Sequence, residues 1–151
     1  MKRLFSSLSH RAADWSRRSG WFRPATIGER GERVAADFLK QSGLKIITRG
    51  FRNRSGEIDV IALDSETVVF VEVKTRRNHS AGHPAEAVDA RKQAQLGRLA
   101  IGFRRQHRLM QYPARFDVIA VTWPDVSAEP KIEHFRDAFA LPAVGSTNGQ
   151  S

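Results

Sequence analysis

Three charged residues, Asp59, Glu72 and Lys74, lie within runs of residues that favour β-strands. A charged side chain in such a run is costly unless it is paired, bound to a metal ion or exposed. Glu72 and Lys74 are two residues apart and so point to one face of a strand, and a short hairpin would bring Asp59 alongside Glu72. A hard divalent cation such as Mg²⁺ relieves the repulsion between two carboxylates and also binds water and phosphate. A neighbouring lysine would then compensate charge on an attacking water or on a phosphate.

The alternative interpretation is an exposed cross-strand cluster of ion pairs, which is common on solvated sheet faces. Spacing alone favours this alternative over a metal site. A further acidic residue, Asp117, lies in another apolar run. We expect it to pair with Arg115 or to cap a neighbouring helix.

The elements that must position these residues alternate between helical and strand patterns. A capping-box pattern at Thr26 and Glu29 and a stop at Gly43 predict a helix over residues 27–42. Residues 45–51, 57–63 and 67–75 predict three strands joined by short turns, and 87–107 predict a long helix. Residues 115–123 predict a buried strand, 131–135 a short edge strand, and 136–139 a segment that covers one end of the core. The order is α, three strands, α, strand, which is an α/β fold.

The composition indicates one soluble globular domain with a polyanionic partner. The chain has 151 residues, 25 Lys and Arg against 16 Asp and Glu, a net charge of +9 and no cysteine. Without cysteine, disulfides, thiolate nucleophiles, iron–sulfur clusters and Cys-based zinc fingers are excluded. No stretch is apolar for long enough to span a membrane. Nucleic acid is the first partner to consider, ahead of an acidic membrane surface.

Both ends of the chain differ from the body. Residues 1–26 carry six basic residues against Asp14 alone, and we expect a basic disordered tail there. Two alternatives stay open for this segment: a short basic amphipathic helix and an organelle transit peptide. Residues 140–151 have no charge and no period, and we expect a frayed tail. The domain is therefore predicted over residues 27–139.

A basic surface is predicted from the second helix and the turns beside the acidic residues. Arg91, Arg98 and Arg105 recur every seven residues, within a run that also holds Arg104 and Arg115 and no acid. Arg52, Arg54, Arg76 and Arg77 flank the acidic residues in the sequence. Together they could hold a sugar-phosphate backbone, although a solvated helix face is the usual role of such a stripe. Neither an aromatic-rich platform for single strands nor a recognition helix is evident, so base-specific readout is not supported.

Six ordered motifs resemble the YraN-like family of bacterial proteins: GERGERVAADFL, RSGEIDVIA, VVFVEVKTR, DARKQAQL, RFDVIAV and IEHFRDAF. That family is in turn similar to the restriction-endonuclease-like superfamily, the PD-(D/E)XK nucleases, and especially to Holliday junction resolvases. The resemblance runs from Ile27 to Phe139. It implies an αβββαβ core with a mixed central sheet flanked by helices.

The resemblance also implies roles for individual residues. Asp59, Glu72 and the backbone carbonyl of Val73 correspond to ligands of Mg²⁺ or Mn²⁺, and Glu32 to a helix carboxylate that assists directly or through a water. Lys74 corresponds to the lysine of the motif. Lys92 occupies the place of a second-helix residue that often completes such sites; the alternative is a lysine whose stem covers the core. Glu57 lies two residues before Asp59 and shares its strand face, so it could be an alternative ligand or take an outer role, and the outer role is favoured.

The function that this resemblance implies is a metal-dependent endonuclease that cuts branched or junction DNA according to its structure. The alternative is a non-catalytic nucleic-acid-binding protein that retains the nuclease fold. Junction-resolving relatives act as dimers, which suggests a homodimer. We expect a cytoplasmic protein, because the lack of cysteine is compatible with a reducing compartment.

Overall fold

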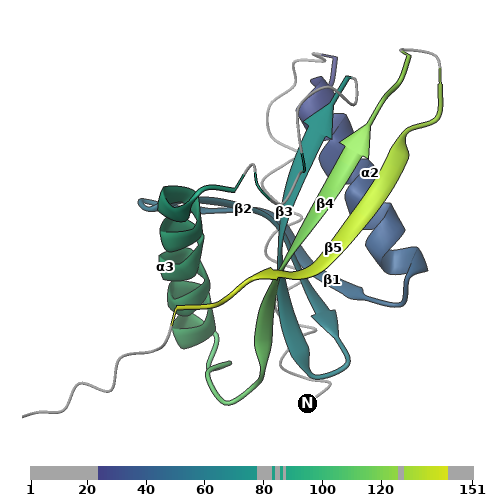
Figure 1. Cartoon of the computed structure of the whole chain (residues 1–151). Coiled ribbons are helices and arrows are strands. Elements are labelled where there is room, and N and C mark those ends of the chain that lie inside the picture. Colours follow the sequence, from purple (N-terminus) through teal and green to yellow (C-terminus); the bar gives the residue numbers. More distant parts are fainter. Residues whose placement is uncertain (1–23, 78–82, 84–85, 87, 126–127, 143–151) are drawn as a thin grey trace, which may run out of the picture.

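In the described part of the chain, a five-stranded sheet carries one helix on each face (Figure 1). The computed structural model describes residues 24–77, 83, 86, 88–125 and 128–142. The elements, in chain order, are α2 (Ile27–Gln41), β1 (Lys45–Asn53), β2 (Gly56–Asp64), β3 (Thr67–Arg76), α3 (Ala90–Gln106), β4 (Ala114–Thr122) and β5 (Lys131–Phe139). The strand order is β1-β2-β3-β4-β5; β3 and β4 are parallel and the other neighbours are antiparallel. The predicted αβββαβ core with a mixed sheet is confirmed.

Helix α2 starts where the sequence predicts, because the capping box is formed. The Thr26 side chain accepts from the amide of Glu29, and the Glu29 carboxylate accepts from the amide of Thr26. The buried face of α2 carries Ala35 and Leu39. It packs on a core of β2, β3 and β4 side chains that we call the α2-side core, with these buried members: Ala35, Leu39, Leu44, Val60, Ala62, Val69, Val71, Ile119, Val121 and Trp123.

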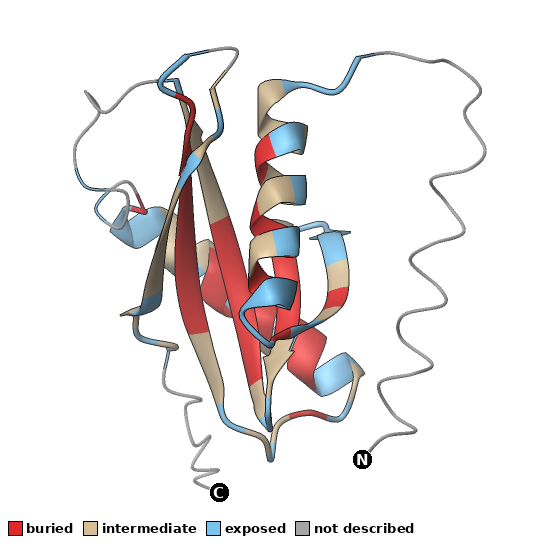
Figure 2. Ribbon diagram, turned by 90° about the vertical axis from the view of Figure 1, so that its right-hand side faces the viewer, coloured by how far each residue is buried: buried red, intermediate tan, exposed pale blue. Residues whose placement is uncertain are grey.

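Helix α3 covers the opposite face. Its first residue is Ala90 rather than the predicted Ala87, because the Asp89 side chain caps the amide of Lys92. Leu96, Leu99 and Phe103 recur at helical spacing and are buried. They face buried side chains such as Ile58, Phe70 and Phe116, which form the α3-side core. Figure 2 shows the buried residues concentrated in the sheet and on the inner faces of both helices.

Strand β2 leaves β3 partway along its length. The β2–β3 ladder runs from Asp64 and Thr67 to Val60 and Val71, whereas the β1–β2 ladder continues to Asn53 and Gly56. Beyond Val60, β1 and β2 therefore form a two-stranded arm that extends toward α3 (Figure 1). Asp59 lies at the point where this arm departs from the sheet.

Strand β5 is longer than the short edge strand predicted over 131–135. It runs from Lys131 to Phe139 along β4, with a register shift opposite Phe116 and Val118. Asp137 has a positive φ of 50° at this bulge, and its amide donates to buried Asp117. The bulge interrupts the alternation of side chains, which explains why residues 136–139 did not show a strand pattern. Leu141 also packs on the α3-side core, beyond Phe139 where the domain was predicted to end.

Among the described residues, no helix is both long and apolar enough to cross a membrane. The tail predicted over residues 1–26 lies outside the described part of the chain except for its last three residues. Most of the tail predicted over 140–151 lies outside it as well.

Candidate active site

Asp59 connects β2 to β3 just past the end of their ladder. Its Oδ2 accepts a hydrogen bond of 2.8 Å from the amide of Val73. Burial and the negative charge of Glu72 raise the pKa of Asp59 to about 7, against the lowering effect of that hydrogen bond, and Glu32 and Glu57 add to the rise. The side chain is thus held in a site where its negative charge is unfavourable.

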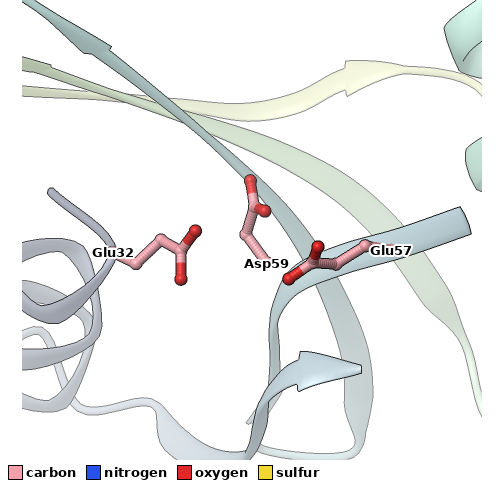
Figure 3. Close-up of side chains that lie close together, drawn as sticks. All are labelled: Glu32, Glu57 and Asp59. Atoms are coloured by element: carbon pink, nitrogen blue, oxygen red, sulfur yellow. The ribbon is translucent and has the colours of Figure 1, made fainter. Parts of the chain in front are cut away.

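Three carboxylates converge on this point from two elements. Oxygen atoms of Glu32 on α2 and of Glu57 and Asp59 on β2 all lie within 4.8 Å of one another. Figure 3 shows Glu32 reaching across from the helix toward the other two. Burial and the charge of Glu57 raise the pKa of Glu32, while Arg49 lowers it. Such a group of partly buried oxygens suits a hard divalent cation.

Glu57 lies closer to the centre than the sequence predicted. It was given an outer role, yet it stands in the compact group with Glu32 and Asp59. Its Oε2 also accepts from Arg52 Nε at 3.0 Å and Nη2 at 2.8 Å. Arg52, predicted to contact phosphate, therefore holds a carboxylate of the site.

Glu72 is the most buried acid of the site, with 8% of its side chain exposed. Its Oε1 lies 3.3 Å from Lys74 Nζ and 3.8 Å from Lys92 Nζ. Its Oε2 is buried and has no hydrogen-bond partner in the part of the chain that the structure describes. A carboxylate oxygen left in this state is costly unless a ligand completes it. Lys92 reaches this carboxylate from α3, in agreement with the prediction that a residue of the second helix lies at the site.

These donors fit a divalent cation. They are carboxylate oxygens, and one of them, Glu72 Oε2, is buried without a hydrogen-bond partner among the described residues. The negative charges of Glu72 and Asp59 also repel each other. The structure brings Glu32 and Asp59 together as predicted and adds Glu57. It places Lys74 and Lys92 beside the carboxylate of Glu72, which lies next to that group.

Two glycines allow the elements to approach closely enough to form the site. A Cβ at Gly31 would collide with the side chain of Thr75, so α2 lies directly against β3 and carries Glu32 with it. Gly56, with φ of 137°, starts β2 against Gln95 of α3. The Gln95 Nε2 donates to the carbonyl of Ser55 at 2.5 Å and so holds the β1–β2 arm. Sequence reasoning missed Gln95, although its place one turn after Lys92 was a signal.

The predicted basic surface is present on α3, in part. Arg91, Arg98 and Arg105 are exposed, and a cavity of about 320 Å³ is lined by Arg91, Lys92, Gln95 and Arg98 together with Asp89. Arg54 and Arg77 are exposed as well. Arg76 is half-buried and makes other interactions of its own.

Two arginines of the α3 run do not belong to that surface. Arg104 is buried, donates to the carbonyls of Met110 and Tyr112, and has its pKa lowered by burial. Arg115 pairs with Asp117 and Asp64, which confirms the expected partner of Asp117. Both therefore support the fold.

The profile of the uncharacterised protein family UPF0102 matches residues 31–121 of this chain. A UPF0102 protein of Geotalea daltonii is 49% identical over 116 residues, which cover 77% of this chain and 91% of that protein. A UPF0102 protein of Rhodopirellula baltica is 42% identical over 128 residues, covering 83% and 77%. One of Chlorobium phaeobacteroides is 42% identical over 122 residues, covering 78% and 97%.

Proposed function

This chain belongs to the uncharacterised protein family UPF0102, which is the YraN family that its motifs resemble, and we propose that it is an endonuclease. The proposed enzyme depends on Mg²⁺ or Mn²⁺ and hydrolyses phosphodiester bonds in DNA. The observation that carries the proposal is the orphaned, buried Glu72 Oε2 next to Asp59, a carboxyl group whose pKa is raised to about 7. The residues around that oxygen could hold a cation, which would satisfy it and offset the repulsion from Glu72 that, together with burial, raises the pKa of Asp59. Perturbed acids of this kind cluster at functional sites.

The residues that would hold the ion are Asp59, Glu72 and the carbonyl of Val73, with Glu32 directly or through a water. Glu57 extends this set because it shares the compact group with Asp59. When bound, the ion would lower the pKa of a water and neutralise charge on the scissile phosphate.

The protein's own cations act on the reacting groups. Hydrolysis forms a bond from water oxygen to phosphorus and breaks the bond from phosphorus to the leaving sugar oxygen. Lys74 Nζ, held near Glu72, positions the water or compensates the charge that develops on the phosphate. Lys92 Nζ approaches the same carboxylate from α3 and contacts the phosphate from the helix side.

The proposed substrate is branched or junction DNA, and the resemblance to Holliday junction resolvases supports it. The exposed arginines of α3, together with Arg54 and Arg77, contact the sugar-phosphate backbone, which carries no sequence information. The same resemblance supports a homodimer, and the lack of cysteine is compatible with a place in the cytoplasm, as parts of the proposal.

The proposal is tested with Asp59→Asn and Lys74→Ala in nicking assays on a four-way junction and a plain duplex across several divalent ions. In calcium or without divalent ions, Asp59→Asn should bind junction DNA at least as well as wild type, because it removes a negative charge beside the phosphate. In Mg²⁺ or Mn²⁺ it should cut nothing. Lys74→Ala should lose cleavage yet keep metal in a calorimetric titration, because Lys74 is no ligand.

Asp37→Asn is the matched control, since Asp37 is an exposed aspartate of α2 paired with Lys40. It should cut like wild type. If wild-type protein binds the junction but takes up no metal and cuts nothing under any condition, the nuclease proposal fails. The chain would then be the alternative, a non-catalytic nucleic-acid-binding protein.

A further inference from the structure

Two adjoining cavities lie on the flank of α2 that faces away from the carboxylates. Each has a volume of about 380 Å³, and both are lined by Arg30 of α2 and by Trp123, which follows β4. Arg77 and Asp125 line the first cavity, and Arg33 and Glu129 line the second. The N-terminal end of α2 lies beside the ends of β3 and β4, so residues far apart in the sequence meet here (Figure 1).

Arg30 and Trp123 form a planar platform between these cavities. The guanidinium carbon of Arg30 lies 5.2 Å from the centroid of the Trp123 ring. Trp123 is 6% exposed and belongs to the α2-side core, whereas Arg30 is exposed. The guanidinium therefore lies over a fixed aromatic ring, and the Arg30 side chain is accessible to solvent. Arginine planes and aromatic rings are the surfaces on which unpaired bases stack.

The side chains around the platform match the other parts of a nucleotide. Arg33 and Arg77 supply charge for a phosphate, and Asp125 and Glu129 supply carboxylates of the kind that accept from amino groups on base edges. We propose that these cavities bind an unpaired nucleotide of the DNA strand that enters the active site, an inference that rests on the proposed function. The platform was invisible in the sequence because no aromatic-rich segment encodes it.

The position of the platform relative to Glu32 explains its use. Arg30 and Glu32 are two residues apart on α2, so they leave the helix about 200° apart. The carboxylates and the platform are thus separated by the width of one helix, about 10–12 Å. A continuous duplex keeps its bases stacked inside and presents none to the platform. Only DNA with an unpaired segment near the scissile phosphate engages both places, which favours tailed substrates and those branched substrates whose branch point leaves a base unpaired.

The experiment compares a blunt duplex with the same duplex carrying a short thymidine tail, by fluorescence anisotropy in calcium with the full-length protein. Wild type should bind the tailed duplex about tenfold more tightly than the blunt one, the range expected for one stacked base. Arg30→Ala should remove that preference and leave affinity for the blunt duplex unchanged. Arg30→Lys should lose the preference too, because lysine keeps the charge and lacks the plane. Lys45→Ala, which removes one exposed charge at the start of β1, should keep it.

Two outcomes overturn the inference while leaving the nuclease proposal intact. One is equal affinity of wild type for both duplexes together with metal-dependent cleavage. The other is a preference that survives in Arg30→Lys, which would make the site a simple positive charge. If wild type binds neither duplex, the proposed function fails together with the inference. Melting temperatures of each variant confirm that the loss is not one of folding.

Discussion

At the scale of single residues, the ionised carboxylate of Asp59 destabilises the folded protein. Its pKa is raised to about 7 by burial and by the charge of Glu72, so the folded state keeps a proton that the unfolded chain has already released. Glu32 is perturbed in the same direction. Because the ionised form of these acids is disfavoured, binding of a cation in place of their protons would be favourable.

This perturbation gives a pH-dependent stability with a defined sign. Between about pH 4 and pH 7 the folded state binds more protons than the unfolded state, so the free energy of unfolding should fall as pH rises. Asp59→Asn removes the effect and should be more stable than wild type by at most about 4 kcal/mol at about pH 8 in a chelator, since one pKa unit corresponds to about 1.4 kcal/mol. Urea denaturation at several pH values measures this. Asp37→Asn is the control, and parallel profiles for Asp59→Asn and wild type would contradict the assignment.

At the scale of elements, the two faces of α3 have different roles: one packs on the sheet and the other is exposed to solvent. Leu96, Leu99 and Phe103 hold it on the sheet, while Arg91, Arg98 and Arg105 are exposed. Replacing these three arginines with serine should weaken binding to unrelated DNA sequences alike. The slope of log affinity against log salt should flatten by about 0.9 for each lost phosphate contact.

The melting temperature of this triple variant should barely change. A control with serine at Lys40, Lys45 and Lys131 loses the same charge from other elements. If both triple variants change the salt slope equally, the stripe on α3 has no special contact with DNA and is a solvated face.

Strand β5 is joined to β4 through one buried acid. Asp117 is 0% exposed and accepts from Arg115, His134 and the amide of Asp137. Burial alone would raise its pKa, but hydrogen bonds from His134 and Arg115 together with the Asp137 amide lower it. Its stabilising effect is therefore present above the pKa of the unfolded chain and is lost as pH falls.

Asp117→Ala should destabilise the protein by about 3–5 kcal/mol, because half-buried Arg115 and His134 both lose this buried partner and Arg115 keeps only Asp64. Urea denaturation at neutral pH measures the loss. Glu133→Gln, at a more exposed site on the neighbouring strand β5, should change stability little. A loss of equal size in both variants would show that Asp117 has no special role.

The sequence predicts most of the fold because its signals are local. The capping box of α2, the stripe of α3 and the β-branched run of β3 each act within a few residues. The strand conformation at the end of β5 could not be predicted, because its bulge depends on Asp117, a partner on another strand. The place of Glu57 and the pairing of Arg30 with Trp123 escaped for the same reason: each is set by how distant elements pack.

At the scale of the whole molecule, the sheet separates two cationic surfaces and brings the carboxylates between them. The exposed arginines of α3 lie on one face, and Arg30, Arg33 and Arg77 line the cavities beside α2.

Truncation tests which residues complete the fold. A chain of residues 24–142 should melt close to the full-length protein, because the described core lies within it. Removing residues 140–142 as well should lower the melting temperature, since Leu141 packs on the α3-side core and Pro142 lies against Gly97. Differential scanning calorimetry compares the three chains. A collapse of the transition in residues 24–142 would show that residues 1–23 contribute to the core.

The residues at positions 31 and 75 must remain sterically compatible with each other when either one mutates. Any Cβ at position 31 meets the Thr75 side chain, so a change to alanine there survives only in a lineage where position 75 has already lost its β-branch. The order of the two mutations is therefore fixed, with position 75 changing first. Across descendants the two positions should drift together, although neither is expected to touch metal or DNA. The spacing between Glu32 and Asp59 is in this sense set by two neighbours that carry none of the chemistry themselves.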